Sequence, residues 1–449
     1  MGAACCAGAA VAGGAGPTSL LDGTIWGFVS ALPIALYHYY PHVALGLVTL
    51  LAAATSTLYL AVVWLTPVTK TSSRSELSYV SPASAAPQPL PSLLDDAEEV
   101  QLSVVVPAYN ERERLPIMLR ETVEFLESLR REKRSLVQGS DEADANVAAS
   151  AGEEHKDAQT VRKALYDPLE TYEIVLVDDG SRDGTHEVAL EFGREHGVEV
   201  RVVRLVKNRG KGGAVRHGVL HSRGSLVLFA DADGATRFGD VSTLSRALAH
   251  ILTPRGHAMV VGSRAHMVKS DAVVKRSWLR NLLMHSFHLL LTLLLRPPTP
   301  ASLIPAFLRR KDGCARGEQR QRLPVQPEIK DTQCGFKLFT RPTAKLVFPA
   351  SHIDGWIFDV ELILLAQAAS NLAMQSKPPC MPSQQGHGQG ECKGLEGLAL
   401  PIAEVAVHWH EVGGSKIALL TDSVRMALDL VVIRANYGLR RWQPPPPAL

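Results

Sequence analysis

Cysteine is scarce in this sequence, and its placement excludes two protein classes. The six cysteines among 449 residues form no C-x-x-C pair. Zinc ribbons and disulfide-dense secreted domains both need regularly spaced cysteines, so neither class fits. A strong net charge is absent as well, because the formal charge is only +2. Without the basic stripe of nucleic-acid-binding domains, we expect no nucleic-acid partner and a main domain in a reducing compartment.

Charged residues are missing from one long apolar run near the N-terminus, residues 43–65. At ~1.5 Å per residue, a helix over this run crosses a hydrocarbon core of roughly 30 Å. Tyr40 and Trp64 near its ends suit membrane interfaces. A cleaved signal peptide is the alternative, but no basic segment precedes the run. Lys70 and Arg74 follow it, so the positive-inside rule predicts a single-pass anchor with the larger C-terminal part in the cytosol.

Short apolar runs alternate with amphipathic stretches from residue 101 onward. This order is typical of βαβ units, so we expect an α/β, Rossmann-like fold with a mostly parallel sheet flanked by helices. The runs expected to form strands are 102–107, 173–177, 200–205, 225–230 and 258–262. The predicted organisation is an N-terminal region 1–42, partly interfacial at 25–37, an anchor 43–65, a Ser-, Pro- and Ala-rich linker 66–100, a main domain 101–442 with insertions at 138–167, 297–328 and 376–397, and a Pro-rich tail 443–449.

Two further apolar stretches are candidates for contact with a membrane. Residues 282–295 are strongly apolar but too short to span a bilayer, so an interfacial helix and a buried core helix are equally consistent with them. Residues 417–442 mix apolar side chains with Arg425, Arg434 and two further arginines. Such a mixture suits a helix on an anionic surface.

Two carboxylates, Asp231 and Asp233, come directly after the expected strand 225–230. The sequence there is Asp-Ala-Asp-Gly. In open α/β sheets, ligands bind at the carboxyl ends of strands. Paired hard oxygens at such a place suit Mg²⁺ or Mn²⁺ that also touches a phosphate-bearing substrate. An ordinary Asp-Gly turn is the alternative for this motif in isolation.

Polar groups follow three other expected strands as well. Tyr109 could pack on a nucleobase, and an aspartate of the Asp178-Asp179 pair could accept a base N–H, while Asp178 is more simply structural. Glycines 210, 212 and 213 would let backbone N–H groups approach a phosphate, with Lys211 as a point charge. The segment matches neither a Walker A loop nor G-x-G-x-x-G, so it does not indicate ATP or NAD. Four such loops at one sheet edge favour a binding site over turns alone.

Taken as a set, these strings resemble the family-2 nucleotide-sugar glycosyltransferases of GT-A fold. The resemblance covers about residues 101–442, apart from the three insertions. Its most specific strings are NRGKGGAVRHG (208–218) and DTQCGFKLF (331–339). The others are VVPAYNE (105–111), VDDGSRDGT (177–185), ADADGAT (230–236), GSRAH (262–266), WIFDVEL (356–362) and GGSK (413–416).

The resemblance implies UDP-glucose as donor, dolichyl phosphate as acceptor and the endoplasmic-reticulum membrane as location. The product would be dolichyl β-D-glucosyl phosphate, made with inversion, for lipid-linked oligosaccharide assembly in protein N-glycosylation. It places nucleotide binding at Pro107, Tyr109, Glu111 and Asp179, joined by Lys211, Gly212 and Asp231, and metal binding at Asp231 and Asp233.

A phosphate acceptor changes the chemistry expected of the site. A phosphate monoester has its second pKa around 6, so it is already a competent nucleophile near neutral pH. A strong general base is then unnecessary, and cationic positioning of the acceptor is needed instead. Arg264 is the first candidate. Trp356 is expected to contact the sugar, and Asp359 is expected to have a sugar-binding or structural role. Further acceptor-phosphate candidates, each equally consistent with a solvated surface, are Arg276, Arg280, Lys337 and Lys416.

Two other functions remain open from the sequence. Dolichyl-phosphate mannosyl transfer from GDP-mannose would use the same scaffold and acceptor, and the residues alone do not choose the hexose. A catalytically silent, membrane-tethered nucleotide-sugar binder is the alternative from another class. Asp231, Asp233 and Arg264 are all present, which favours catalysis. The oligomeric state cannot be read from the sequence.

Overall fold

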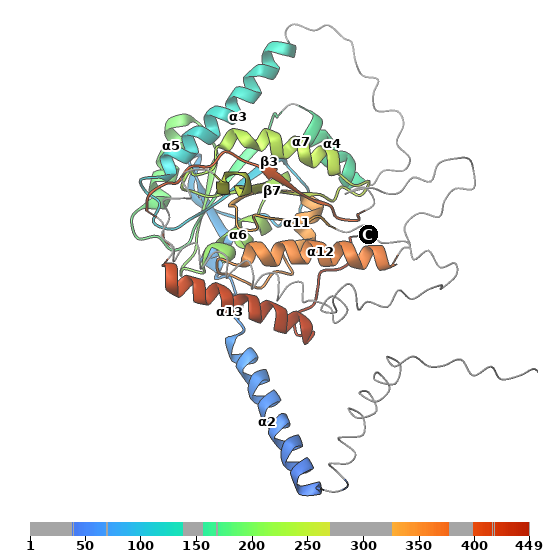
Figure 1. Cartoon of the computed structure of the whole chain (residues 1–449). Coiled ribbons are helices and arrows are strands. Elements are labelled where there is room, and N and C mark those ends of the chain that lie inside the picture. The colour runs from blue at the N-terminus through green and yellow to red at the C-terminus, as the bar shows by residue number, and fades with distance from the viewer. Residues whose placement is uncertain are drawn as a thin grey trace, which may run out of the picture. The chain divides into compact units, whose positions relative to one another are not determined.

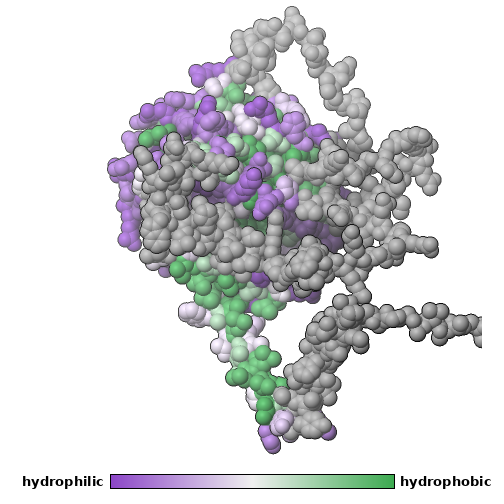
Figure 2. Space-filling model, in the orientation of Figure 1, coloured by the Kyte–Doolittle hydropathy of each residue, from purple (hydrophilic) through white to green (hydrophobic). Residues whose placement is uncertain are grey.

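The computed structural model describes residues 38, 40–68, 71–137, 156–167, 169–269, 326–376, 398–414, 416 and 418–448. By packing, the chain divides into two units, residues 1–66 and 67–449. The first unit contains helix α2 (Pro41–Leu65), which begins two residues before the expected anchor. This helix is long and apolar enough to cross a membrane, and apolar side chains cover most of its visible surface (Figure 2). The runs expected at 25–37 and 282–295 lie outside the described residues.

A nine-stranded mixed sheet forms the second unit, in the order β2-β1-β5-β4-β3-β6-β8-β7-β9. All five strands expected from apolar runs are confirmed, as β3, β4, β5, β6 and β7. Adjacent strands are parallel from β5 through β4 and β3 to β6, whereas β8 is antiparallel to both β6 and β7. The strands are β1 (Ser78–Ser81), β2 (Ser84–Pro89), β3 (Val100–Ala108), β4 (Tyr172–Asp178), β5 (Val200–Arg204), β6 (Gly224–Ala230), β7 (Met259–Ser263), β8 (Phe336–Thr340) and β9 (Ile402–Ala406).

Helices cover both faces of this sheet (Figure 1). One core layer packs beneath α3, α4, α5 and α7, and the other beneath α6, α11, α12 and α13. This arrangement confirms the expected α/β class. The helices are α3 (Leu115–Val137), α4 (Lys156–Tyr166), α5 (Thr185–His196), α6 (Lys211–Leu220), α7 (Val241–Ile251), α11 (Arg341–Val347), α12 (Phe358–Ser376) and α13 (Leu419–Gly438), with short 3-10 turns η1 (Arg74–Leu77), η2 (Phe238–Asp240) and η3 (Ala265–Lys269).

The segment expected to be a linker, residues 66–100, instead extends the sheet. Strands β1 and β2 pair with each other, and Val80 of β1 faces Val202 of β5. Leu93 farther along is fully buried in the core. The Ser- and Pro-rich composition suggested a linker because each strand is too short to show a periodic pattern. Pairing with β5, which is distant in sequence, stabilises them.

Two other expectations about organisation are corrected. Part of the expected insertion 138–167 is helix α4, which buries Ala158, Val161 and Ala164 against the core at a three-residue spacing. The expected Pro-rich tail is not free either, because Ala448 is buried and its N–H donates to the carbonyl of Ala369 in α12. Most of the other two insertions lies outside the described residues.

The sheet order creates a switch point between β3 and β6. From β3 the chain adds β4 and β5 on one side, then returns to place β6 on the other side. Loops leaving β3 and β6 therefore diverge, which opens the crevice where α/β sheets bind ligands. Pro107 and Tyr109 lie at the end of β3, and Asp231 and Asp233 lie just beyond β6.

Candidate active site at the carboxyl edge of the sheet

Asp231 lies where the end of β6 meets the start of β8. Because these strands are antiparallel, the end of one adjoins the beginning of the other. The Asp231 N–H donates to the carbonyl oxygen of Gly335 at 3.1 Å. The Asp231 side chain remains 31% exposed, so it is accessible to a ligand.

Lys211, the first residue of α6, forms an ion pair with Asp231. Its Nζ lies 2.6 Å from Asp231 Oδ1, and 5.9 Å from the centroid of the Trp356 ring. Burial on its own would lower the pKa of Lys211. The carboxylates of Asp231 and Asp359 outweigh burial, and the pKa is raised above its usual range. Lys211 is therefore a fixed cation beside the first aspartate of the pair.

Gly335 permits this placement of Asp231 because it has no side chain. A Cβ at residue 335 would lie 1.9 Å from Asp231 Oδ2 and 2.3 Å from its carboxyl carbon. Any side chain there would displace the carboxylate. Gly335 thus determines where Asp231 can lie.

Asp233 is held by the turn that follows it. Its Oδ1 accepts a hydrogen bond from the Ala235 N–H at 3.0 Å. The turn is tied to the segment after β9, because the N–H of His410 donates to the carbonyl of Ala235 at 2.9 Å and that of Arg237 donates to the carbonyl of His408 at 3.0 Å. The turn therefore has a defined geometry, and Asp233 is half-buried.

The donor set of Asp231 and Asp233 fits Mg²⁺ or Mn²⁺. Both side chains offer hard carboxylate oxygens, and both are only partly buried. Among the residues that the structure describes, no cluster of three or more His, Cys, Asp or Glu side chains could hold a metal. A cation at Asp231 and Asp233 would therefore take its other ligands from a diphosphate and water, which is the usual coordination of Mg²⁺.

Lys337 and Asp359 form a buried ion pair next to these acids. Lys337 Nζ lies 2.6 Å from Asp359 Oδ1 and donates to the carbonyl of Cys334 at 2.6 Å. Lys337 is fully buried and Asp359 is 2% exposed. Burial raises the pKa of Asp359 despite the opposing influence of Lys337 and Lys211. Lys337 is therefore not on a solvated surface, which corrects that alternative for it. The buried ion pair of Asp359 fits the structural role that was left open beside sugar binding.

Arg264 follows β7 and is held by Asp331. Its Nε lies 2.7 Å from Asp331 Oδ2, and its second guanidinium nitrogen donates to Oδ1 at 2.9 Å. The guanidinium also lies 5.6 Å from the Trp409 ring centroid. Burial would lower the pKa of Arg264, but Asp331 keeps it raised. One third of the side chain stays exposed, so one face of a charged guanidinium is available to an anion.

Two acids in the loops after β3 and β4 have hydrogen-bond partners within the protein. Glu111 is 8% exposed, and both its oxygens accept from the Arg114 guanidinium, at 2.5 and 2.7 Å. Asp179 is 3% exposed, and its oxygens accept the backbone N–H groups of Arg209 and Gly210, at 2.7 and 2.9 Å. Both acids hold their loops in place, and their expected direct contact with a nucleotide stays a prediction. Asp178 is structural as expected, because it is fully buried and accepts the Ser181 N–H.

The glycine-rich segment packs closely against residues 353–358. Gly210 has a φ of +97°, and a Cβ there would lie 2.5 Å from the Asp354 carbonyl oxygen. A Cβ on Gly212 would lie 2.5 Å from Phe358 Cβ. These glycines permit close packing of α6 on residues 353–358, and the expected role of Gly212 at a phosphate stays a prediction. Lys211 between them points to Asp231.

Other expected residues have varied positions. Tyr109 is 38% exposed beside the β3 loop, where it could reach a ligand. Lys416 is exposed and donates to the Asn110 carbonyl at 2.9 Å, so it lies beside the same loop. Trp356 is half-buried. Arg276 and Arg280 lie outside the described residues.

Sequence reasoning missed three residues that organise the site. Asp331 and Gly335 both belong to the string DTQCGFKLF, which was used only to support a resemblance. Asp331 lies close to Arg264 after β7, and Gly335 lies close to Asp231 after β6, because β8 pairs with both strands. The sequence alone does not show that pairing. Glu76 lies in the segment expected to be a linker, and no local signal distinguishes it.

Comparison with known proteins gives consistent matches. The model of the glycosyl transferase family 2 matches residues 152–312. The dolichyl-phosphate beta-glucosyltransferase of Drosophila melanogaster is 36% identical over 372 residues, covering 82% of this chain and 85% of that protein. The protein of the same name from Homo sapiens is 37% identical, covering 79% and 81%. The one from Saccharomyces cerevisiae is 35% identical, covering 87% and 92%.

Solved structures give a more distant likeness. A glucosyl-3-phosphoglycerate synthase from Mycobacterium tuberculosis, in complex with UDP, is 16% identical with a TM-score of 0.38, covering 75% of this chain and 80% of that one. A structure of the same protein with Mn²⁺, UDP and phosphoglyceric acid is 15% identical with a TM-score of 0.36, covering 75% and 78%.

Proposed function

Because this chain belongs to the dolichyl-phosphate β-glucosyltransferase family, we propose that it transfers glucose from UDP-glucose to dolichyl phosphate. The product is dolichyl β-D-glucosyl phosphate, which supplies glucose for lipid-linked oligosaccharides in protein N-glycosylation. The observation that carries this assignment at the site is the pair Asp231 and Asp233 at the switch point, with Lys211 beside it. That arrangement suits the diphosphate of a nucleotide sugar.

Transfer with inversion needs the acceptor oxygen in line with the bond from glucose to UDP. The dolichyl phosphate oxygen is already anionic, so no side chain has to remove a proton from it. The absence of a need for a general base is consistent with the position of Asp359, which is buried and paired with Lys337. The main tasks left to the protein are orientation and charge neutralisation.

Two cationic side chains, Lys211 and Arg264, perform these tasks. Lys211 neutralises diphosphate charge at the start of α6. Arg264, held by Asp331 with one face exposed, orients the acceptor phosphate. A bound Mg²⁺ or Mn²⁺, held by Asp231 and Asp233, supplies Lewis-acid stabilisation of the UDP leaving group. Tyr109 is the exposed aromatic available to stack on uracil, and Trp356 the one available to the sugar.

The lipid acceptor implies work at a membrane. We assign α2 as the anchor in the endoplasmic-reticulum membrane, with the catalytic unit in the cytosol by the positive-inside bias. Helix α13 offers a second contact, because Val424, Leu428 and Val431 are 61%, 42% and 40% exposed. The exposed Arg425 and Arg434 lie on the same helix. This combination suits an anionic lipid surface.

The hexose is tested by direct competition between donors. We expect the full-length protein, in detergent with a polyprenyl phosphate and Mn²⁺, to transfer glucose from UDP-glucose and to leave GDP-mannose unused. The measurement is radiolabel in the lipid fraction, and omission of the polyprenyl phosphate is the control. Mannosyl transfer at equal or greater rate would replace the proposal with the mannosyltransferase alternative. Metal-dependent UDP-glucose binding without transfer to any lipid phosphate would favour the silent binder.

Arg264 is expected to act on the acceptor and not on the donor. Replacing Arg264 with Ala should raise the KM for the polyprenyl phosphate by about 10- to 100-fold, because a charged hydrogen bond contributes about 1.5–3 kcal/mol. The KM for UDP-glucose should stay within about twofold. Arg246→Ala, an exposed arginine on α7, is the control for loss of positive charge. A rise in the donor KM with an unchanged acceptor KM would show that the assigned role is wrong.

A further inference from the structure

The segment that follows the membrane helix reaches the glycine-rich turn. We call residues 71–77 the strap; it includes the 3-10 turn η1 and begins six residues after α2 ends. Near its C-terminal end, Glu76 is only 3% exposed. A buried carboxylate is costly unless its oxygens are hydrogen-bonded or paired with a cation, so the partners of Glu76 define what the strap does.

Glu76 joins the strap to the loop between β5 and α6. Its carboxylate accepts the N–H of Ser73 at 2.7 Å and that of Val206 at 2.8 Å. The same carboxylate forms an ion pair with the Arg209 guanidinium. Burial tends to raise the pKa of Glu76, but the two amides and Arg209 prevail and lower it. Glu76 is therefore ionised at neutral pH and fully engaged.

Arg209 is held in place through both its side chain and its backbone. Its guanidinium contacts the strap, donating to Ser72 Oγ and the Thr71 carbonyl at 3.4 Å each. Its backbone N–H donates to Asp179 at 2.7 Å. The side chain is only 6% exposed, so it cannot bind substrate directly. Arg209 instead ties the strap to the turn that ends at Lys211.

A second contact lies two helical turns along α6. His217 Nε2 lies 2.9 Å from the Glu76 carbonyl oxygen. Burial, helped by His221, lowers the pKa of His217 to about 4. The imidazole is therefore neutral near pH 7 and donates its N–H to that carbonyl. Lys211 lies in sequence between Arg209, just before α6, and His217 in its last turn, which both contact the strap.

We propose that the strap is a positioning element for the donor site, and that Glu76 is a positioning residue which acts through Arg209 on Lys211. Lys211 pairs with Asp231 at 2.6 Å, and because Lys211 is the first residue of α6, a shift of the start of α6 would move this cation. The segment directly following the membrane anchor thereby positions Lys211, the cation that contacts the donor diphosphate. This role rests on the proposed function in one respect only, namely that the donor is UDP-glucose.

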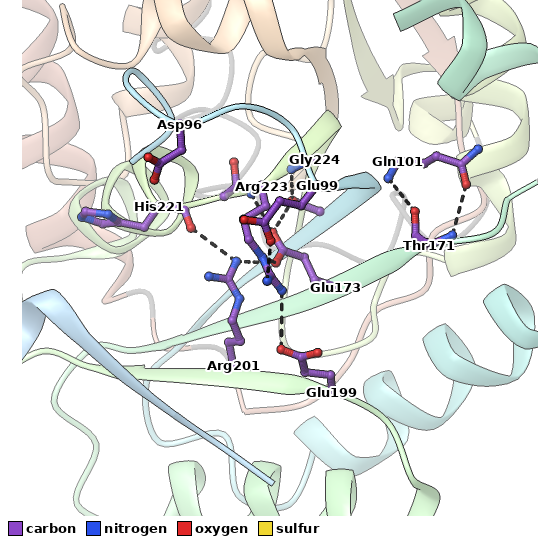
Figure 3. Close-up of polar contacts among 12 residues, drawn as sticks. Asp96, Glu99, Gln101, Thr171, Glu173, Glu199, Arg201, His221, Arg223 and Gly224 are labelled. Carbon is purple, nitrogen blue, oxygen red and sulfur yellow. Dashed lines mark hydrogen bonds and ion pairs between the residues drawn. The ribbon is translucent and has the colours of Figure 1, made fainter. Parts of the chain in front are cut away.

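A buried ion cluster elsewhere in the sheet provides a matched control. Glu173 is 1% exposed and pairs with Arg201 at 2.5 Å and with Arg223 at 2.7 Å (Figure 3). These residues lie near the amino ends of β4, β5 and β6, whereas the candidate site lies at the carboxyl ends. Glu173 thus matches Glu76 in burial and arginine pairing without contact to α6's first turn.

The test compares Glu76→Gln with Glu173→Gln in the full-length protein in detergent. For Glu76→Gln we expect KM for UDP-glucose, and the Kd for UDP with Mn²⁺ by calorimetry, to rise about tenfold, which corresponds to one charged hydrogen bond. The acceptor KM should stay within about twofold. Amide hydrogen exchange should accelerate in a peptide covering residues 206–216. Glu173→Gln should lower Tm without changing the Kd for UDP.

A double-mutant cycle tests the route through Lys211. If Glu76 acts on the donor through Lys211, Glu76→Gln should have no further effect on UDP affinity in a Lys211→Ala background. Fully additive effects, an unchanged Kd in Glu76→Gln, or an equal rise in Glu173→Gln would each overturn the proposal. A wild type that binds UDP but transfers no glucose would contradict the proposed function alone, because UDP affinity and exchange are measured without transfer.

Discussion

Replacing Asp233 with Asn is expected to lower glucosyl transfer by on the order of 10²- to 10³-fold, the loss seen when one group that stabilises transition-state charge is removed. The amide keeps the shape of the side chain, and its oxygen can still accept the Ala235 N–H. What disappears is one of the two negative charges that would hold a divalent cation. Since UDP departs as an anion, loss of that cation should affect kcat most strongly.

The measurement is kcat with saturating Mn²⁺, UDP-glucose and polyprenyl phosphate, together with Tm. Asp422→Asn is the control, because Asp422 accepts the Ala418 N–H at the start of α13, away from Asp231 and Asp233. That variant should retain full activity. Near-normal turnover of Asp233→Asn would remove Asp233 from the metal site. A large fall in Tm would instead indicate a structural role.

Replacing Gly335 with Ala is expected to lower transfer by about 10²-fold through Asp231 alone. The new Cβ would lie 1.9 Å from Asp231 Oδ2, whereas carbon–oxygen contacts in proteins rarely fall below about 3 Å. The carboxylate must therefore move, and its ion pair with Lys211 must lengthen. A shift of about 1 Å at a catalytic group can cost about 10²-fold in rate.

Gly438→Ala is the matched control for this substitution. Apart from its chain neighbours and the backbone of its own helix, no atom of the described residues lies within 4 Å of the Cβ that it would add. Activity and the affinity for Mn²⁺ alone should both fall in Gly335→Ala and remain unchanged in Gly438→Ala. If Gly335→Ala bound Mn²⁺ and turned over like the wild type, Asp231 would not depend on the close approach of residue 335.

The local sequence pattern was sufficient to predict the parallel strands of the sheet. The runs that became β3, β4 and β6 are apolar, short and bounded by turn residues, and they are buried as the pattern predicts. The acids after β6 were predicted for the same reason, because carboxyl ends of parallel strands share one edge. Pattern failed for β1 and β2, which are too short to show periodicity, and for α4, whose three buried alanine and valine side chains lie in a polar segment.

The sequence by itself determined the order of elements and the position of Asp231 and Asp233 at the end of a buried strand. It could not determine which charged groups would be free. Lys337 is paired with Asp359 across 22 residues, Arg264 with Asp331 across 67, and Arg209 with Glu76 across 133. Periodicity reports backbone preferences over a few residues, whereas these pairs depend on which elements pack together. Tertiary structure therefore decided that Lys337 is buried, that Arg264 keeps one face exposed, and that the expected linker holds the turn before Lys211.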